Sequence, residues 1–251
     1  MKRIVFLVLA VLLTAMLAAC SNESAVLEDS RTYEISSDIH SLDIRINAAD
    51  FTIEHGNAFS VESNLKDLAV SEKDGVVIIV DEPKPAVNYT DARLKLCVPE
   101  GIVFESVEIT TGAGKLTADS LSANSLVLKL GAGKVYFGCL NAYSDIDLEG
   151  GAGEITVADG SLHDLTLGLG VGELNLTAAL PGESDLKFGV GASNVTLIGS
   201  RDDYNVEIEK GLGSITVDGN TDPNSGSTGT DRHHIEIKGG VGAVHVTFRE
   251  E

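Results

Sequence analysis

Two short segments of the sequence carry the residue types that bind phosphate in many nucleotide-binding proteins. Gly112-Ala-Gly-Lys115 and its copy beginning at Gly131 place a lysine directly after two glycines. A phosphate loop also needs a Ser or Thr after the lysine and a helix after the glycines, because the hydroxyl binds Mg²⁺ and the helix N-terminus binds the phosphate. Both copies lack the hydroxyl, and alternating apolar residues follow them. We therefore interpret these segments as turns between strands.

Metal binding is the second chemistry that the residue types suggest. The six histidines lack the spacing of a metal site, except that His233, His234 and His245 could meet across neighbouring strands, which leaves zinc as a minor alternative. Calcium is another, because 38 acidic residues against 18 basic ones give a net charge of −20. The Asp-containing glycine repeat of calcium-binding β-rolls is absent, so solvated acidic faces are the favoured interpretation. We predict no metal, no cofactor and no catalytic residue.

One cysteine stands where a covalent modification is expected. Residues 1–20 open with two basic residues, continue with an apolar run and end in Leu17-Ala-Ala-Cys20, the pattern of a secretory signal. The ending resembles the lipobox of bacterial lipoproteins, which implies cleavage before Cys20 and a diacylglyceryl group on its sulfur. A plain signal peptide or a membrane-spanning anchor is the alternative, although the apolar run is shorter than the ~20 residues of a span. We predict a signal peptide over residues 1–19 and a lipidated tether over residues 20–32.

The predicted anchor places the chain on the extracytoplasmic face of a bacterial cell membrane, with that membrane as its first partner. Cys97 and Cys139 would then lie in an oxidising compartment, where a disulfide is one alternative and free thiols are the favoured one. The excess of acidic residues argues against nucleic acid as a partner.

The elements that position these residues are set by an internal repeat. A Gly-x-Gly pattern returns seven times, with first glycines 19 to 21 residues apart except for a last step of 29. The first glycines are Gly112, Gly131, Gly151, Gly170, Gly191, Gly211 and Gly240, and Ser193 replaces the second glycine of the Gly191 copy. A fixed period near twenty residues is typical of folds in which each repeat buries its apolar face against the next.

Apolar and polar residues alternate on both sides of each glycine pair. Counted from the first glycine, positions −5, −3, −1, +1, +4 and +6 are expected to face one interior, as Leu128 and Val135 do in the Gly131 repeat. The second glycine is expected at a tight corner, where a Cβ is unfavourable. Each repeat then supplies two short strands, and Lys134 should meet Glu154 on the next repeat. Stacked about 4.8 Å apart, the repeats predict an all-β fold, a parallel β-solenoid with about 20 residues per coil.

The region before the repeats has a looser rhythm. Residues 42–53 fit the same pattern with Asn47-Ala-Ala49 in place of the glycines, which predicts an atypical first coil. Antiparallel strands are predicted over residues 59–62, 68–70 and 76–80, and a further strand over residues 94–98 is expected to stop at Pro99. Asp74-Gly75 is expected as a hairpin turn, and the strands should cap the open end of the coils. The predicted organisation is a first coil and β cap over residues 33–105, then repeats over 106–251 with a loop insertion at 218–232.

Two segments resemble a known family. Leu94-x-Leu-x-Val-Pro-x-Gly101 is followed by Val107-x-Ile-x-x-Gly-x-Gly-x-Leu-x-Ala118 and then by the two-strand repeats. This order resembles the bacterial "putative adhesin" family of β-strand-repeat domains and covers nearly all of residues 31–251. The resemblance implies a β-solenoid, an adhesion role without an established ligand and, for some relatives, an association with cell-envelope stress. It carries no functional residues to this chain.

We therefore predict a non-enzymatic cell-surface lipoprotein, an adhesin or a scaffold module whose partner is an envelope polymer or protein. A regulatory role in an envelope-stress response is the alternative. A polysaccharide-acting enzyme is a distant third, by analogy with lyases built on β-helices. Such an enzyme needs acids and bases clustered on adjacent coils, and outward positions −4 and −2 show no such cluster. Recognition is expected at the loop 218–232 and near residues 83–90.

Overall fold

The computed structural model describes residues 27–81, 89–220 and 232–250. These residues form one 15-stranded, mixed and mostly parallel sheet, with the short 3-10 helix η1 (Arg201–Asp203) as their helical element. The all-β prediction is confirmed. The strands are β1 (Leu27–Glu34), β2 (Ser41–Gly56), β3 (Ser60–Leu65), β4 (Ala69–Lys73), β5 (Val76–Val80), β6 (Arg93–Pro99), β7 (Phe104–Val157), β8 (Gly160–Leu162), β9 (Leu165–Ala178), β10 (Gly182–Lys187), β11 (Val190–Ile198), β12 (Tyr204–Glu209), β13 (Ser214–Val217), β14 (His233–Lys238) and β15 (Val241–Arg249).

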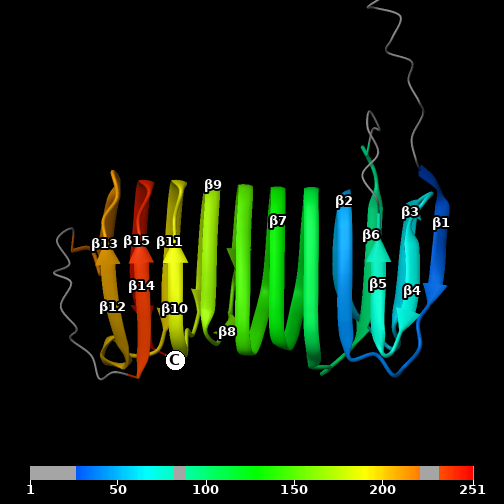
Figure 1. The fold of residues 1–251 in the computed structure, drawn as a ribbon, viewed down its shortest axis with the longest axis horizontal. Helices are drawn as coiled ribbons and strands as arrows, with labels where there is room; N and C mark the ends of the chain where they lie inside the picture. The colour runs from blue at the N-terminus through cyan, green and yellow to red at the C-terminus, as the bar shows by residue number, and fades with distance from the viewer. Residues whose placement is uncertain (1–26, 82–88, 221–231, 251) are drawn as a thin grey trace, which may run out of the picture.

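The long strands bend at the glycine corners, so that each contributes to two faces. Residues 41–45 of β2 pair with β5, whereas residues 50–56 pair with β6, both in parallel. The first face continues towards β10, β14 and β12, and the second towards β11, β15 and β13. Figure 1 shows the strands side by side along the long axis, from β1 at one end to β12 and β13 at the other.

Equivalent positions of neighbouring repeats lie in register. Leu148 pairs with Leu167 and Gly153 with Gly172, which places the same residue types side by side across β7 and β9. The predicted interior is confirmed at its centre, since Leu128 and Leu167 are 0% and 1% exposed. Outside the interior, the Nζ of Lys134 lies 3.0 Å from a carboxylate oxygen of Glu154, as the repeat alignment predicts.

The glycine corners are tight for two reasons. Most second glycines adopt a positive φ, such as 132° at Gly133 and 153° at Gly172, which other residues rarely adopt, although Gly213 does not. A Cβ on Gly133 would also lie 1.9 Å from the carbonyl oxygen of Gly114 on the preceding repeat. Ala49 occupies the same place in the first coil without a positive φ and is 7% exposed. β5 and β6 pair with residues 41–45 and 50–56, so no described strand pairs with this corner on the side away from β7.

The expectation for position +1 is wrong. Val171, Val190 and Val241 occupy this position and are 58%, 49% and 50% exposed. The alternation of sides stops at the corner because the positive φ of the second glycine turns the chain, so the residues between Leu130 and Val135 are all exposed. Position +1 therefore forms an outward column along the edge of the molecule.

The predicted alignment of the fifth repeat is also wrong. Val190 pairs with Val171 and Gly191 with Gly172, so Gly191 is the second glycine of a pair that begins at Gly189. Ser193 consequently occupies interior position +4 and is only 5% exposed. The sequence allows both alignments, because glycines stand two residues apart and the apolar alternation is unchanged by a shift of two residues.

The last two repeats do not stack in the order of the sequence. β14 lies between β10 and β12, and β15 lies between β11 and β13, in parallel on both sides. The repeat that contains β12 and β13 is therefore separated by one position from the repeat that contains β10 and β11. The C-terminal repeat, which contains β14 and β15, occupies the position between them. The buried Tyr204 holds the start of β12, donating a hydrogen bond to Ile198 O at 2.6 Å and packing against His233 and Phe248.

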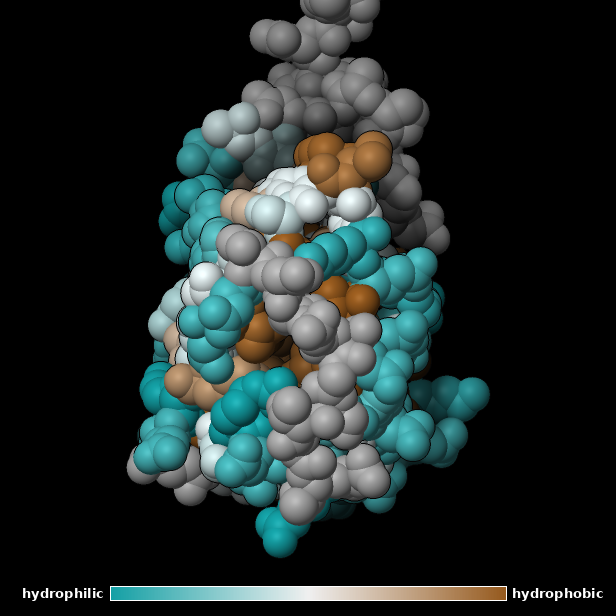
Figure 2. All heavy atoms as spheres, turned by 90° about the vertical axis from the view of Figure 1, so that its left-hand side faces the viewer, coloured by the Kyte–Doolittle hydropathy of each residue, from teal (hydrophilic) through white to brown (hydrophobic). Residues whose placement is uncertain are grey.

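The two ends of the stack differ. At one end the β4–β5 hairpin turns at Asp74 and Gly75, with φ of 51° and 74°, as predicted. β1 pairs antiparallel with β3 at the same end, so the sheet begins at Leu27, inside the segment expected as a tether. At the other end, the side of β12 away from β14 bears no strand of the described part, and Figure 2 shows apolar residues at the centre of this end with hydrophilic ones around them.

Candidate functional site

The predicted lipidation site, Cys20, lies outside the described residues, so its acylation stays a prediction. Within the described ranges, no helix is both long and apolar enough to cross a membrane. Cys97 and Cys139 are both free thiols, on β6 and β7 respectively, which agrees with the favoured interpretation. Both are half-buried.

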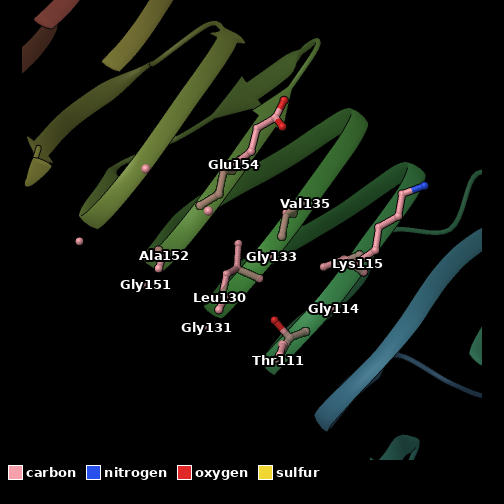
Figure 3. A pocket seen from close by; sticks show the side chains of 18 of the residues that line it. Thr111, Gly114, Lys115, Leu130, Gly131, Gly133, Val135, Gly151, Ala152 and Glu154 are labelled. Carbon is pink, nitrogen blue, oxygen red and sulfur yellow. The ribbon is translucent and has the colours of Figure 1, made fainter. Parts of the chain in front are cut away.

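The Gly-x-Gly-Lys segments form corners between strands. The repeats line a narrow apolar groove that runs along the glycines from Ala49 to Val171, and Figure 3 shows that Lys115 and Glu154 extend away from it. The carbonyl oxygens of neighbouring repeats leave little space at these glycines, since a Cβ on Gly133 would lie 1.9 Å from Gly114 O. Lys134 is engaged instead with Glu154, whose hydrogen bond raises the pKa of the lysine. The corners are thus structural, as the sequence predicts.

The three C-terminal histidines are not brought together. The ring of His233 packs on Tyr204 with its Nδ1 accepting a hydrogen bond from Gly182 N, and His245 Nδ1 lies 2.8 Å from the Thr216 hydroxyl on another face. In residues 27–81, 89–220 and 232–250, no three His, Cys, Asp or Glu side chains are grouped so as to hold a metal ion.

The corrected alignment places more carboxylates together than the sequence suggested. Position −4 of the fifth repeat is Asp185, and this residue lies beside Glu236, which lies beside Glu207. Position −2 of the same repeats is Lys187, Lys238 and Glu209. Acidic and basic side chains therefore gather on one face of three adjacent repeats, a cluster that the sequential stacking order had hidden.

Ion pairing within this cluster keeps its central carboxylate charged. Lys238 Nζ lies 2.8 Å from Glu236 Oε1, and this hydrogen bond, followed by one with Asp185, holds the pKa of Glu236 below its ordinary value. The partner lysine has a raised pKa for the same reason. A general acid needs a raised carboxyl pKa, so Glu236 is unsuited to that role.

The sequence missed a hollow beside the turn between β6 and β7. It has a volume of about 190 Å³ and is lined by His55, Val98, Gly101, Ile102, Val103, Phe104, Ser120, Leu121, Ser122 and Tyr143. His55 Nε2 lies 2.7 Å from Ser120 Oγ across two neighbouring repeats. The signal that could have revealed this pair is the repeat alignment, because Ile53 pairs with Ala118 and each partner lies two residues further on.

A serine hydroxyl bonded to an imidazole is also the first contact of a catalytic triad. A triad needs a third group that orients the imidazole and backbone N–H groups that bind an oxyanion. The imidazole of His55 is hydrogen-bonded to Ser120, and no carboxylate is among the described residues that line the hollow. The arrangement is therefore suited to binding through hydrogen bonds rather than to acyl transfer.

No family model and no curated protein matches the chain. Among solved structures, it is similar to a putative adhesin from Bacteroides fragilis, with 13% identity, a TM-score of 0.46 and coverage of 86% of this chain and 95% of that one. It is also similar to a putative cell adhesion protein from Clostridium sporogenes, with 12% identity, a TM-score of 0.38 and coverage of 88% of this chain and 99% of that one. A putative lipid binding protein from Parabacteroides distasonis is similar as well, with 15% identity, a TM-score of 0.36 and coverage of 88% of this chain and 94% of that one. The chain thus has structural matches to bacterial proteins described as adhesins across most of its length.

Proposed function

We propose that this chain is a non-enzymatic, lipid-anchored module on the outer face of a bacterial membrane, where it presents a rigid β-stack to an envelope polymer or protein. The observation that carries the proposal is that outward side chains form hydrogen bonds and ion pairs between neighbouring repeats. Asn194 donates a hydrogen bond to Asn175 at 2.8 Å, Thr196 lies 3.2 Å from Thr247, and Lys134 pairs with Glu154. Side chains bonded along the stack stiffen it and present a regular surface.

We infer further that the sheet closes into a parallel β-solenoid of about 20 residues per coil. Two features support this. Repeats pair in register on both faces, and the corner of each repeat touches the corner of its spatial predecessor, as Gly112 does with Asn47, Gly240 with Gly189 and Gly211 with Gly240. The same contacts give the order of the coils independently of the strand pairing.

An anchor at Cys20 would hold one particular end of the stack at the membrane. The chain from Cys20 to Leu27 can span at most about 25 Å, since an extended residue covers roughly 3.5 Å. β1 lies at the end opposite β12 and β13 (Figure 1). The hollow at His55 and Tyr143 belongs to the first coils and would therefore lie in the membrane-proximal half.

Two measurements test this proposal. Changing Cys20 to Ser should abolish incorporation of labelled fatty acid and move the protein from the membrane to the soluble fraction. The purified protein should cosediment with the insoluble polymer of its own envelope, and C20S should do so equally well because the anchor takes no part in that contact. A C20S protein that stays in the membrane fraction contradicts the anchor, and a protein that never cosediments contradicts polymer binding.

One observation favours the enzyme alternative, namely the carboxylates of Asp185, Glu236 and Glu207 on adjacent repeats. Inverting and retaining glycosidases use two carboxyl groups, one of which must be protonated. The lowered pKa of Glu236 is unsuited to that role. Release of reducing ends from a polysaccharide, abolished by Glu236→Gln in a folded protein, would decide for the enzyme. The regulatory alternative rests on the family resemblance alone.

A further inference from the structure

We propose that the hollow between the β6–β7 turn and the first coils binds one uncharged sugar ring. This inference rests on the proposed function, since it names the part of an envelope polymer that the protein would contact. The hollow measures about 190 Å³. Pockets for drug-sized ligands measure about 300–1,000 Å³, so this one has room for a single ring, with the rest of a polymer outside.

One wall of the hollow is apolar and exposed. Tyr143 is 54% exposed and Val103 is 47% exposed, although large apolar side chains of this chain are otherwise mostly buried. Ile102 and Val98 continue this wall, half-buried and buried respectively. An exposed aromatic ring beside aliphatic groups is suited to the C–H face of a sugar, because such a face is apolar while its edge is polar. Tyr143 is therefore the expected stacking platform.

The remaining wall offers hydrogen-bonding groups around the same hollow. His55 Nε2 and Ser120 Oγ lie 2.7 Å apart, and Ser122 Oγ accepts a hydrogen bond from Asn141 Nδ2 at 3.1 Å. A hydroxyl that accepts one bond retains its own O–H as a donor, and an imidazole bonded through one nitrogen retains the other. These groups are held in place by their bonds, so they can meet ring hydroxyls without being reordered.

Charge selects among sugars. None of the ten residues that line the hollow is Asp, Glu, Lys or Arg, and the weakly basic imidazole of His55 is bonded to Ser120, in a chain with a net charge of −20. A uronate would bring a carboxylate into a site that holds no Lys or Arg to pair with it, against the negative field of the protein. The structure therefore favours a neutral hexose or N-acetylhexosamine over an acidic sugar.

The test is a titration of the ¹⁵N-labelled mature protein with glucose, N-acetylglucosamine and galacturonate, followed by amide chemical shifts. We expect saturable shifts with at least one neutral sugar, centred on residues 101–104 and 120–122, and none with galacturonate. Tyr143→Ala should weaken binding at least tenfold, whereas Tyr143→Phe should retain it because the ring remains. Tyr136→Ala is the matched control, since Tyr136 is 44% exposed on β7 but lies outside the hollow.

Several results would overturn the inference. These are the absence of saturable shifts with both neutral sugars, equal binding of galacturonate, or undiminished binding by a folded Tyr143→Ala protein. Cosedimentation with the envelope polymer separates this inference from the proposed function. If Tyr143→Ala cosediments as well as the wild type, the hollow is not the contact, although the polymer-binding proposal stands. If the wild type binds free sugar but never the polymer, the hollow is a sugar site and the polymer-binding part of the proposed function is wrong.

Discussion

Four glycine-to-alanine substitutions would separate the two reasons for which the corners need glycine. Gly153 has a φ of 140°, and a Cβ there would lie 1.9 Å from the carbonyl oxygen of Gly133. Gly151 lacks a positive φ, but its Cβ would lie 2.4 Å from Gly131 O. Gly101 has a φ of 74° with nothing within 4 Å of a Cβ, and Gly168 has neither constraint. Gly153 therefore combines the unfavourable φ with the steric contact, Gly151 has only the steric contact, Gly101 has only the unfavourable φ, and Gly168 has neither.

The expected losses of stability follow from these contacts. A left-handed or glycine-only φ costs another residue about 1–3 kcal/mol. Displacing the backbone of a neighbouring repeat costs about 1–3 kcal/mol, occasionally more. Replacing glycine where neither applies stabilises by about 0.4–1 kcal/mol through the unfolded chain. We expect a loss of about 3–5 kcal/mol for Gly153→Ala, about 1–3 for Gly151→Ala and about 1–2 for Gly101→Ala, with a small gain for Gly168→Ala.

The assay is equilibrium unfolding in urea, followed by circular dichroism, with the midpoint and slope fitted for each variant. Equal slopes would show that the same surface unfolds in all variants and that the midpoints can be compared. If Gly153→Ala unfolds at the same urea concentration as Gly168→Ala, the argument from contacts between corners is refuted. A Gly151→Ala protein as stable as the wild type would refute the steric part alone.

Two further predictions concern the interior and the charged cluster. Leu167→Asp should destabilise the fold by more than about 4 kcal/mol, because a charge would enter an interior where Leu167 is 1% exposed. Leu167→Met should cost less than about 1.5 kcal/mol, because the side chain stays apolar and of similar volume. Urea unfolding of both variants, followed by circular dichroism, measures these losses of stability. The stabilisation from Glu236, whose folded pKa is lowered chiefly by Lys238, should be complete above its ordinary value of 4.5 and be lost as the pH falls through the lower folded value. Urea midpoints measured through this range should depend less on pH in Glu236→Gln, and an identical dependence in both proteins would contradict the assignment.

The interior could be predicted from the sequence where the geometry is local. Leu128 and Val135 lie inside because side chains alternate along a strand, and this rule holds between corners. Position +1 was mispredicted because a positive φ at the second glycine interrupts the alternation, and the sequence showed the glycine but not the direction of its turn. The exposed Val171 is the result.

The repeat pattern could not predict the alignment of the fifth repeat or the contact between His55 and Ser120. A shift of two residues preserves both the alternation and a glycine at the corner, so Gly189 and Gly191 could not be told apart as first glycines. The hydrogen bond between His55 and Ser120 joins residues 65 positions apart and depends on the atypical first coil pairing with β7. The candidate site was missed for this reason, since each of its residues is unremarkable within its own repeat.

The position of the C-terminal repeat has a consequence for how the stack is completed. β12 and β13 precede β14 and β15 in the sequence but lie outside them, so each gains its strand partner only when the last repeat is in place. β15 is thereby paired with β11 over its whole length and with β13 over residues 243–246, which limits the fraying that is common at termini. Among the described strands, the edges at this end are those of β12 and β13, and Glu207 and Glu209 put negative charge on β12. Charged edge strands discourage pairing with other chains, so the arrangement keeps an open-ended stack from growing by addition of further copies.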